Sequence, residues 1–563
     1  MVDLQWIQES FSWPKKPIQT QNQNQNNQGT NHGTALPSSP AEYLSALESL
    51  QTQERALAYD AAAIANATQT ERDAAAIFDA MRAKERERSS SSGHGDHFLA
   101  NVDRIDDGSS DLMRVARALP KGAHLHCHFN TVLHPSFLVR RARDVRCMYV
   151  RSSCSLAGDT RFKEAAITFS VLREADVLAV GVGDVFEKDY TPYAWMRYSD
   201  FLQRFPGGLE EGEEWLVGKM VLAVEDVHAV NQTLEGVWDL FNRSTQMMKG
   251  LFNYESAFRA YIGAAIDSFV ADNIMYAEVR PNFFDKYIVS DDGETRLDHH
   301  AWLRIIGEET AAKIRQLDAE GEKGRFVGMK VIYCAPRSIR HEDMEWCLND
   351  CIELKQAFPD LICGFDMVGC ESRGHPLRHF HAQLLAFQSR CTALALPIPF
   401  LFHAGETLDS RSPTDSNLYD AILLRTKRIG HGYALAHHPL LMQRCRELRI
   451  AVEICPISNE ILHLCASVAA GAHVLPTLLA NNVPCALSSD NPAYFRSSLG
   501  HDFYAVAVGM GVVGLLGCKV LVEWGIEHSC MEAEERAGVR RVWEGRWRGF
   551  CEWVVREFGG VYL

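Results

Sequence analysis

The sequence predicts an α/β fold of the (β/α)8 barrel type, and three observations carry this prediction. Eight short apolar runs with β-branched residues alternate with helical patterns between residues 122 and 490. Polar motifs that contain histidine, glutamate or aspartate stand at the ends of several of these runs. With 563 residues, the chain is long enough for a barrel of about 250 residues and further segments. In such barrels the carboxyl ends of the strands form the rim where chemistry takes place.

The segments outside the barrel differ from it in composition. Residues 1–40 are predicted to be a disordered tail, because Gln, Asn, Ser, Thr and Pro dominate residues 17–40. Residues 41–118 form a predicted helical extension, in which Ala, Glu, Arg and Leu at helical spacing give one or two helices before residue 88. The last predicted segment is helical and covers residues 531–563.

The predicted barrel spans residues 119–530. Its strands are expected at residues 122–128, 274–280, 326–333, 361–367, 398–403, 427–431, 449–455 and 484–490. Helical segments alternate with them, such as 301–319, 342–358 and 439–448. The first crossover, residues 131–273, is far longer than a βα unit needs and contains three tryptophans. A long segment over the rim is typical of a lid or a partner-binding insertion.

The charge of the chain bears on its partners. Its 57 basic and 72 acidic residues give a formal charge of −15, and no basic block is long enough to bind a row of phosphates. This composition argues against a nucleic acid or an anionic membrane as partner and favours a small-molecule substrate. The candidate assembly is a homodimer formed through the helical extension.

Cysteines and apolar stretches indicate the compartment. The sixteen cysteines are scattered singly and include no C-x-x-C pair, which is typical of reduced core residues. Residues 1–16 lack the apolar core of a secretion signal, so the cytoplasm is the expected location. Two uncharged apolar stretches, residues 461–489 and 503–518, are interrupted or too short to span a membrane, and we expect them inside the barrel.

A first motif alternates histidine with other residues on one strand. His124, His126 and His128 recur with period two, so on a strand they share one face, while Leu125 and Cys127 point the other way. A single strand histidine is usually a core residue. Three histidines in alternation instead favour a site in which two of them bind one metal ion.

Four more residues stand at the ends of later strands. His403 follows an apolar run, Glu406 lies in the turn after it, His431 stands between two glycines, and Asp490 ends the last strand. Each alone has a structural alternative, such as a turn histidine or a helix cap. Together, a histidine pair, a lone histidine and a lone aspartate form the open ligand pattern of a hydrolytic zinc, with a glutamate placed for proton transfer.

At this point the residues resemble a known family, the adenosine deaminase family, and are most similar to its adenosine deaminase growth factor group. The resemblance covers roughly residues 41–530 and rests on these motifs in order: Pro120-Lys121-Gly122 with Leu125-His126-Cys127-His128, Gly364-Phe365-Asp366-Met367-Val368-Gly369, His403-Ala404-Gly405-Glu406-Thr407, Gly430-His431-Gly432, Cys455-Pro456-Ile457-Ser458-Asn459 and Ser488-Ser489-Asp490. The resemblance implies hydrolytic deamination of adenosine or 2'-deoxyadenosine, with one Zn²⁺ per chain.

The resemblance also implies a role for each motif residue. The zinc ligands it implies are His126, His128, His403 and Asp490. Its implied catalytic residues are Glu406, which protonates purine N1, His431, which stabilises the attacking oxygen, and Asp490, which accepts a proton. For the substrate it implies the backbone N–H of Gly369 at N3 and the aromatic ring of Trp238.

Two positions depart from the family pattern. Asn491 stands where the family has a second acid facing purine N7, and its amide can donate a hydrogen bond there. Asn130 stands where the family has an aspartate for the ribose 5'-hydroxyl. Other readings stay open: deamination of adenine or an adenylate, or a growth-factor-like binding protein with weak catalysis. An extracellular location, as in the growth factor group, is the alternative to the cytoplasm.

Overall fold

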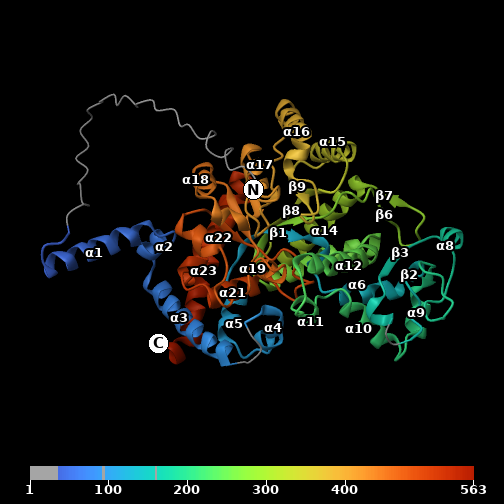
Figure 1. Ribbon diagram of the computed structural model, residues 1–563, viewed down its shortest axis with the longest axis horizontal. Helices are drawn as coiled ribbons and strands as arrows, with labels where there is room; N and C mark the ends of the chain where they lie inside the picture. Colours follow the sequence, from blue (N-terminus) through green and yellow to red (C-terminus); the bar gives the residue numbers. More distant parts are fainter. Residues whose placement is uncertain (1–35, 92–95, 159–160) are drawn as a thin grey trace, which may run out of the picture. The chain divides into compact units, whose positions relative to one another are not determined.

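The computed structural model describes residues 36–91, 96–158 and 161–563 (Figure 1). The chain falls into two compact units, residues 1–55 and 56–563, which are considered separately. In the described part of the smaller unit, helix α1 (Pro40–Leu57) begins. Residues 1–35 of the predicted disordered tail lie outside the described residues.

Eight parallel strands form the centre of the larger unit. They make two four-stranded sheets with the orders β1-β5-β8-β9 and β10-β11-β12-β13. Their bounds are β1 Gly122–His128, β5 Ile274–Arg280, β8 Gly328–Pro336, β9 Ile362–Val368, β10 His403–Ala404, β11 Arg428–His431, β12 Ala451–Ile454 and β13 Cys485–Leu487. All eight strands coincide with the segments that the sequence predicts, and the predicted α/β class with parallel strands is confirmed.

Bridges connect the two sheets at both edges. A parallel bridge between Phe365 and Phe400 joins β9 to the segment before β10, and another between Cys127 and Asp490 joins β1 to the segment after β13. At the second junction the backbone N–H of His128 donates to the carbonyl of Asp490 at 2.9 Å. The strands therefore follow one another in a closed order, as expected of a (β/α)8 barrel.

Three strands, β10, β12 and β13, are clearly shorter than predicted, and β12 covers only Ala451–Ile454 of the expected residues 449–455. The strand expected at residues 398–403 is regular only from His403 to Ala404, because Pro397 and Pro399 have no N–H to donate to a neighbouring strand. The strand expected at residues 484–490 ends as β13 at Leu487. Beyond it the backbone turns, and Asp490 adopts a left-handed conformation with φ +57°.

Helices follow the strands at the expected places. Helix α14 begins after Asp298, whose side chain accepts from the N–H of Ala301, and α18 begins with a proline, Pro439. The helices of the barrel are α14 His299–Ala319, α15 His341–Ala357, α16 His381–Ala393, α17 Asn417–Leu423, α18 Pro439–Leu448, α19 Pro456–Ile461, α20 Leu475–Ala480, α21 Leu499–Gly509 and α22 Leu515–His528. The predicted helices at 301–319, 342–358 and 439–448 are α14, α15 and α18.

The helical extension contains more helices than predicted. Three helices, not one or two, cover residues 40–91, because Thr68 and Glu71 form reciprocal side-chain to backbone bonds that start a new helix. After α1 the extension contains α2 Ala61–Asn66, α3 Gln69–Ser91, α4 Phe98–Asp106 and α5 Asp111–Ala118. The long C-terminal helix α23 (Ala533–Tyr562) packs on α3, where the indole N–H of Trp547 donates to Glu71 at 2.7 Å.

The insertion after β1 carries its own small sheet. Its three strands are antiparallel in the order β3-β2-β4, with the bounds β2 Met148–Ser152, β3 Ile167–Val171 and β4 Met196–Arg197. Its longer helices are α6 Ser136–Arg141, α8 Glu174–Val180, α9 Tyr198–Arg204, α10 Leu209–Gly218, α12 Leu234–Phe252 and α13 Glu255–Ala271. Helix α12 leads back to the barrel and forms part of the wall of the pocket described below.

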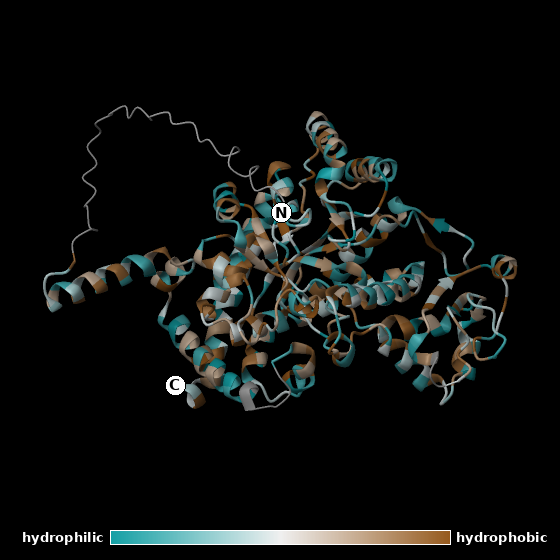
Figure 2. Ribbon diagram, viewed as in Figure 1, coloured by the Kyte–Doolittle hydropathy of each residue, from teal (hydrophilic) through white to brown (hydrophobic). Residues whose placement is uncertain are grey.

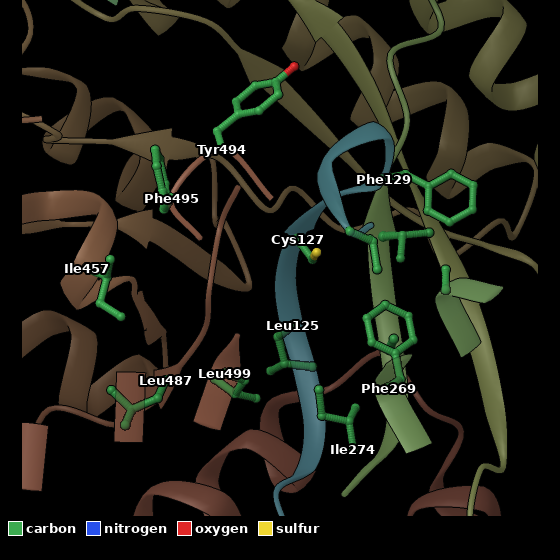
Figure 3. Packing of buried hydrophobic residues seen from close by; sticks show 14 of the residues in the cluster. Leu125, Cys127, Phe129, Phe269, Ile274, Ile457, Leu487, Tyr494, Phe495 and Leu499 are labelled. Carbon is green, nitrogen blue, oxygen red and sulfur yellow. The ribbon is translucent and has the colours of Figure 1, made fainter. Parts of the chain in front are cut away.

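Hydrophobic residues gather toward the centre of the larger unit, whereas hydrophilic residues are prominent on its outer helices (Figure 2). The odd-numbered residues of β1, Leu125 and Cys127, are buried among residues such as Phe269, Ile274 and Leu499 (Figure 3). The two uncharged stretches expected inside the barrel lie in buried elements, including α21. Within the described residues, no helix is both long and apolar enough to cross a membrane.

Candidate functional site

The histidines of β1 face the end of the last strand. The Nε2 atoms of His126 and His128 lie 3.4 and 3.2 Å from Oδ1 of Asp490, and Nε2 of His124 lies 3.0 Å from the hydroxyl of Ser489. The period of two therefore places all three histidines on one face, as predicted. His124 touches Ser489 and so supports the segment that carries Asp490.

Four side chains can offer ligand atoms to one metal ion. Those of His126, His403, His431 and Asp490 are buried and lie within 4.8 Å of one another, and His128 joins the group through Asp490. Nε2 of His126 and Oδ1 of Asp490 are buried without a hydrogen-bond partner among the described residues. Two such atoms that face each other fit a bound cation, which would satisfy both.

Buried carboxylates orient two of these histidines. Glu453 lies 2.7 Å from Nδ1 of His126, and Asp366 lies 2.7 Å from Nδ1 of His403. A carboxylate can only accept a proton here, so each Nδ1 carries the hydrogen and each Nε2 presents its lone pair to the centre of the site. This is the arrangement that metal-binding histidines adopt in proteins.

Two arginines balance these carboxylates inside the barrel. Arg280 pairs with Asp366 at 2.9 Å and with Glu453 at 2.7 Å, and Arg428 bridges Glu453 and Glu278 at 2.5 and 2.6 Å. All five side chains are fully buried. Removal of one partner would leave an uncompensated buried charge, so the network fixes the positions of the carboxylates.

Asp490 is held ionised and in a strained conformation. Burial opposes its ionisation, but the adjacent rings of His126 and His128 keep the pKa of its carboxyl well below the usual range. Its other oxygen, Oδ2, accepts from the hydroxyl of Ser458 at 2.7 Å. Asp490 and His431 both have left-handed backbones, with φ +57° and +59°, and such strain in non-glycine residues is concentrated at functional sites.

Glu406 lies over the same site in the turn after β10. Burial, followed by the nearby charges of Asp490 and Glu371, raises the pKa of its carboxyl well above the usual range. Oε1 of Glu406 lies 3.4 Å from Nδ1 of His431. The turn itself is fixed by Glu371, which accepts from the N–H groups of Gly405 and Glu406 at 3.2 and 2.9 Å. Glu406 therefore holds its proton to a higher pH than an ordinary glutamate does.

A chain of hydrogen bonds sets the tautomer of His431. The N–H of Leu475 donates to Nδ1 of His473 at 3.0 Å, so the proton of this neutral ring is on Nε2, which donates to Oδ1 of Asn459 at 3.0 Å. The amide nitrogen of Asn459 then faces Nδ1 of His431 at 3.2 Å. Burial lowers the pKa of His431 well below its usual value, so this ring is neutral with its hydrogen on Nε2.

A pocket of about 410 Å³ opens above these side chains. Nine of the ten site residues predicted from the sequence line it: His128, Asn130, Trp238, Gly369, His403, Glu406, His431, Asp490 and Asn491. The tenth, His126, is fully buried just beneath it. A larger hollow of about 810 Å³ lies at the opposite ends of the strands and has no histidine in its lining, so it is not the chemical site.

Sequence reasoning missed the residues that support the site. Glu453, Glu371, Arg280, Arg337 and His473 were given no role, and neither were Asp366, Ser458 and Asn459, although these three lie in the quoted motifs. Arg337 is buried and donates to the carbonyls of Met367 and His403, which ties the ends of β9 and β10 together. A signal was present, because Glu453 and Arg280 are charged residues inside or at the end of apolar strand patterns.

Comparisons with known proteins identify the family of the chain. The family model described as adenosine deaminase matches residues 220–542. An adenosine deaminase of Phlebotomus duboscqi is 30% identical over 82% of this chain and 82% of its own length. The human adenosine deaminase 2 is 28% identical over 81% of this chain and 82% of its own length. The crystal structure of an adenine deaminase from Arthrobacter aurescens, 16% identical, covers 77% of this chain and 99% of that chain with a TM-score of 0.50.

Proposed function

Because the chain belongs to the adenosine deaminase family, we propose that it hydrolyses adenosine and 2'-deoxyadenosine to inosine and 2'-deoxyinosine with release of ammonia. One observation carries the proposal: Glu406, a glutamate with a raised pKa, and a buried group of histidines with Asp490 face the same pocket. Replacement of an aromatic amino group by water needs both an acid for the ring and an activated water.

We assign one zinc ion to the buried group, with His126, His128, His403 and Asp490 as ligands. His431 is close enough to be a ligand instead of His128, but its Nε2 carries a hydrogen and its Nδ1 faces Asn459. A bound zinc ion supplies Lewis-acid activation of a water molecule at neutral pH.

The side chains of the pocket perform the proton transfers. Glu406 donates its proton to purine N1, which makes C6 electrophilic. The attacking water passes a proton to Asp490, and the Nε2 hydrogen of His431 bonds the incoming oxygen. The water oxygen bonds to C6, Asp490 passes its proton on to the amino nitrogen, and the bond from C6 to that nitrogen breaks, so that ammonia leaves. The proton of the new hydroxyl group returns to Glu406, which leaves the C6 carbonyl of the product.

Other lining residues hold the purine nucleoside. The N–H of Gly369 reaches N3, and its left-handed backbone, with φ +101°, suits glycine at this position. The amide of Asn491, which is 3% exposed, faces N7. Trp238 on α12 covers the substrate from the insertion, and Asn130 lies where the ribose enters.

Two alternatives differ in their expected behaviour. Deamination of adenine or an adenylate would use the same chemistry with another preference at the sugar end of the pocket. A growth-factor-like protein with weak catalysis would bind without turnover, which the complete set of ligands and Glu406 argues against.

A panel of aminopurines tests the proposal. Adenosine, 2'-deoxyadenosine, adenine and AMP are incubated with the full chain, and the loss of ultraviolet absorbance at the adenosine band is followed with and without chelator. We expect turnover of the two nucleosides to exceed that of adenine and AMP and to stop with chelator. Faster turnover of adenine or AMP would assign the alternative substrate, and no turnover of any aminopurine would refute the function.

A further inference from the structure

A second group of potential metal ligands lies outside the pocket. Ligand atoms of His97, His228 and Glu460 lie within 4.8 Å of one another. They come from three parts of the chain: His97 precedes α4, His228 follows α11 (Val224–Val227) in the insertion, and Glu460 lies in α19 of the barrel (Figure 1). We propose that this group is a second, structural site for a divalent transition-metal ion such as Zn²⁺.

Glu460 is a buried carboxylate without a cationic partner. It is 1% exposed, and the charged group of the described chain that acts on it is another acid, Asp96. Its two oxygens accept from the N–H groups of Phe98 and Val468 at 2.5 and 2.7 Å, which orients them but supplies no positive charge. Burial raises the pKa of Glu460 to about 7. A bound cation would compensate the charge of this carboxylate.

The two histidines have the form that binds a metal. Their rings are stacked, with centroids 3.9 Å apart and an angle of 23° between the planes. Two imidazolium ions would repel each other at this distance, and burial followed by the neighbouring histidines lowers the pKa of His228 to about 4. Nδ1 of His97 and Nε2 of His228 are buried without a hydrogen-bond partner in the described part of the chain. Imidazole lone pairs lie in the ring plane, so the two rings must turn out of this stack for one metal ion to give both nitrogens a partner.

The space and the ligand types also fit. A cavity of about 20 Å³ adjoins His97 and Glu460, with Arg104 but not His228 also in its lining, and roughly 10 to 15 Å³ is enough for one water molecule. Two imidazole nitrogens and a carboxylate oxygen are ligands that suit zinc and its neighbours better than calcium or magnesium. Nearby, Nε2 of His463 bonds the carbonyl of Val227, which holds the segment that carries His228. The ion would tie the extension and the insertion to the barrel.

Metal content measured in paired variants tests the proposal. Each full-length protein is stripped, loaded with Zn²⁺ and dialysed, and zinc per chain is counted by mass spectrometry. His228→Gln removes a proposed second-site ligand, His403→Ala removes a pocket ligand, and His381→Gln is the matched control, because His381 is exposed on α16. We expect two zinc ions in the wild type and in the control, and one fewer in His228→Gln, in both the wild-type and the His403→Ala backgrounds. Equal zinc content within both pairs overturns the proposal.

Thermal stability gives a readout that is independent of catalysis. In the His403→Ala background, added Zn²⁺ should raise Tm, and the additional His228→Gln change should remove this rise. If His228→Gln does not fold, the nearly isosteric Glu460→Gln takes its place, with folding checked by circular dichroism. Zinc that raises Tm equally with and without the intact group would also overturn the proposal.

Discussion

At the scale of single residues, Glu406 and its neighbours decide the chemistry. The carboxyl of Glu406 is buried next to Asp490, while the backbone of its turn is fixed by Glu371. Burial and two nearby acids raise its pKa, which suits this carboxyl group to the proton-donor role that we propose for it.

Glu406→Gln should lower kcat by about 10² to 10⁴ while zinc content and fold are retained, because the amide cannot transfer a proton. The pH dependence of kcat tests the direction of this pKa shift. Since the protonated form acts and its pKa is raised, wild-type kcat should persist above the range where ordinary glutamates ionise and fall only at higher pH. Steady-state kinetics from pH 5 to 9 measure both effects. A variant with more than about a tenth of the wild-type kcat would rule out Glu406 as the acid.

Asn459 sets the tautomer of His431, so its charge and hydrogen-bonding capacity matter. Asn459→Asp replaces the donating amide by a carboxylate, which would draw the hydrogen of His431 to Nδ1 and away from the pocket. We expect kcat to fall by about 10 to 100-fold, with KM and zinc content nearly unchanged. Asn481→Asp, at an exposed position, is the matched control. If both variants keep the wild-type kcat, the hydrogen-bond chain has no catalytic role.

Asn491 is the residue in which the pocket departs most informatively from the family pattern. Its Oδ1 lies 3.2 Å from the hydroxyl of Thr131, and its side chain lines the pocket without being a proposed ligand. Asn491→Asp should therefore shift the ratio of adenosine to 7-deazaadenosine turnover by roughly tenfold, since a hydrogen bond to a buried ring nitrogen contributes about 1 to 3 kcal/mol. Zinc content should stay constant. Loss of zinc in the variant would show that the roles of Asp490 and Asn491 have been assigned the wrong way round. An unchanged turnover ratio would place Asn491 outside the purine site.

At the scale of elements, the close packing of neighbouring strands lets the histidines converge. A Cβ atom added to Gly430 on β11 would lie 3.0 Å from Cε1 of His126 and 3.3 Å from Cα of His403. Both contacts are tighter than ordinary van der Waals contact, so a side chain here would push His126 or the backbone at His403 aside by a few tenths of an ångström.

Gly430→Ala should weaken zinc binding by roughly tenfold or more, because it displaces His126 from its place beside Glu453. The matched control is Gly263→Ala on α13, where an added Cβ meets nothing within 4 Å. Competition with a chromogenic chelator measures the affinity. Equal affinities in both variants would show that the approach of β11 to His126 does not control the metal site.

Much of the fold could be predicted from the sequence, because local residue patterns indicate where the strands and helices lie. All eight strands were located, since apolar β-branched runs are specific to buried parallel strands, and alternation placed the histidines of β1 on one face. The supporting residues could not be predicted, because they act through partners that are not adjacent in sequence. Glu453 contacts His126, and His473 contacts Asn459. The boundary between α2 and α3 was missed since a capping pair, Thr68 with Glu71, overrides a continuous helical pattern.

At the scale of the whole molecule, the site lies where the first of the eight parallel strands meets the end of the last. His126 and His128 come from the first strand, and Asp490 comes from the end of the last. A zinc ion that binds all three would close the ring at the junction where only isolated bridges connect β1 to the final segment. With the proposed ligands, folding and catalysis would depend on the same ion.

Metal dependence of adenosine turnover is the most direct test of this account. The absorbance of adenosine is followed with zinc-loaded protein, with fully stripped protein and after Zn²⁺ is restored. We predict rapid loss of the adenosine band with zinc, none after stripping, and recovery when Zn²⁺ is added back. Undiminished turnover after complete removal of the metal, or an unchanged adenosine band with zinc-loaded protein, would contradict it.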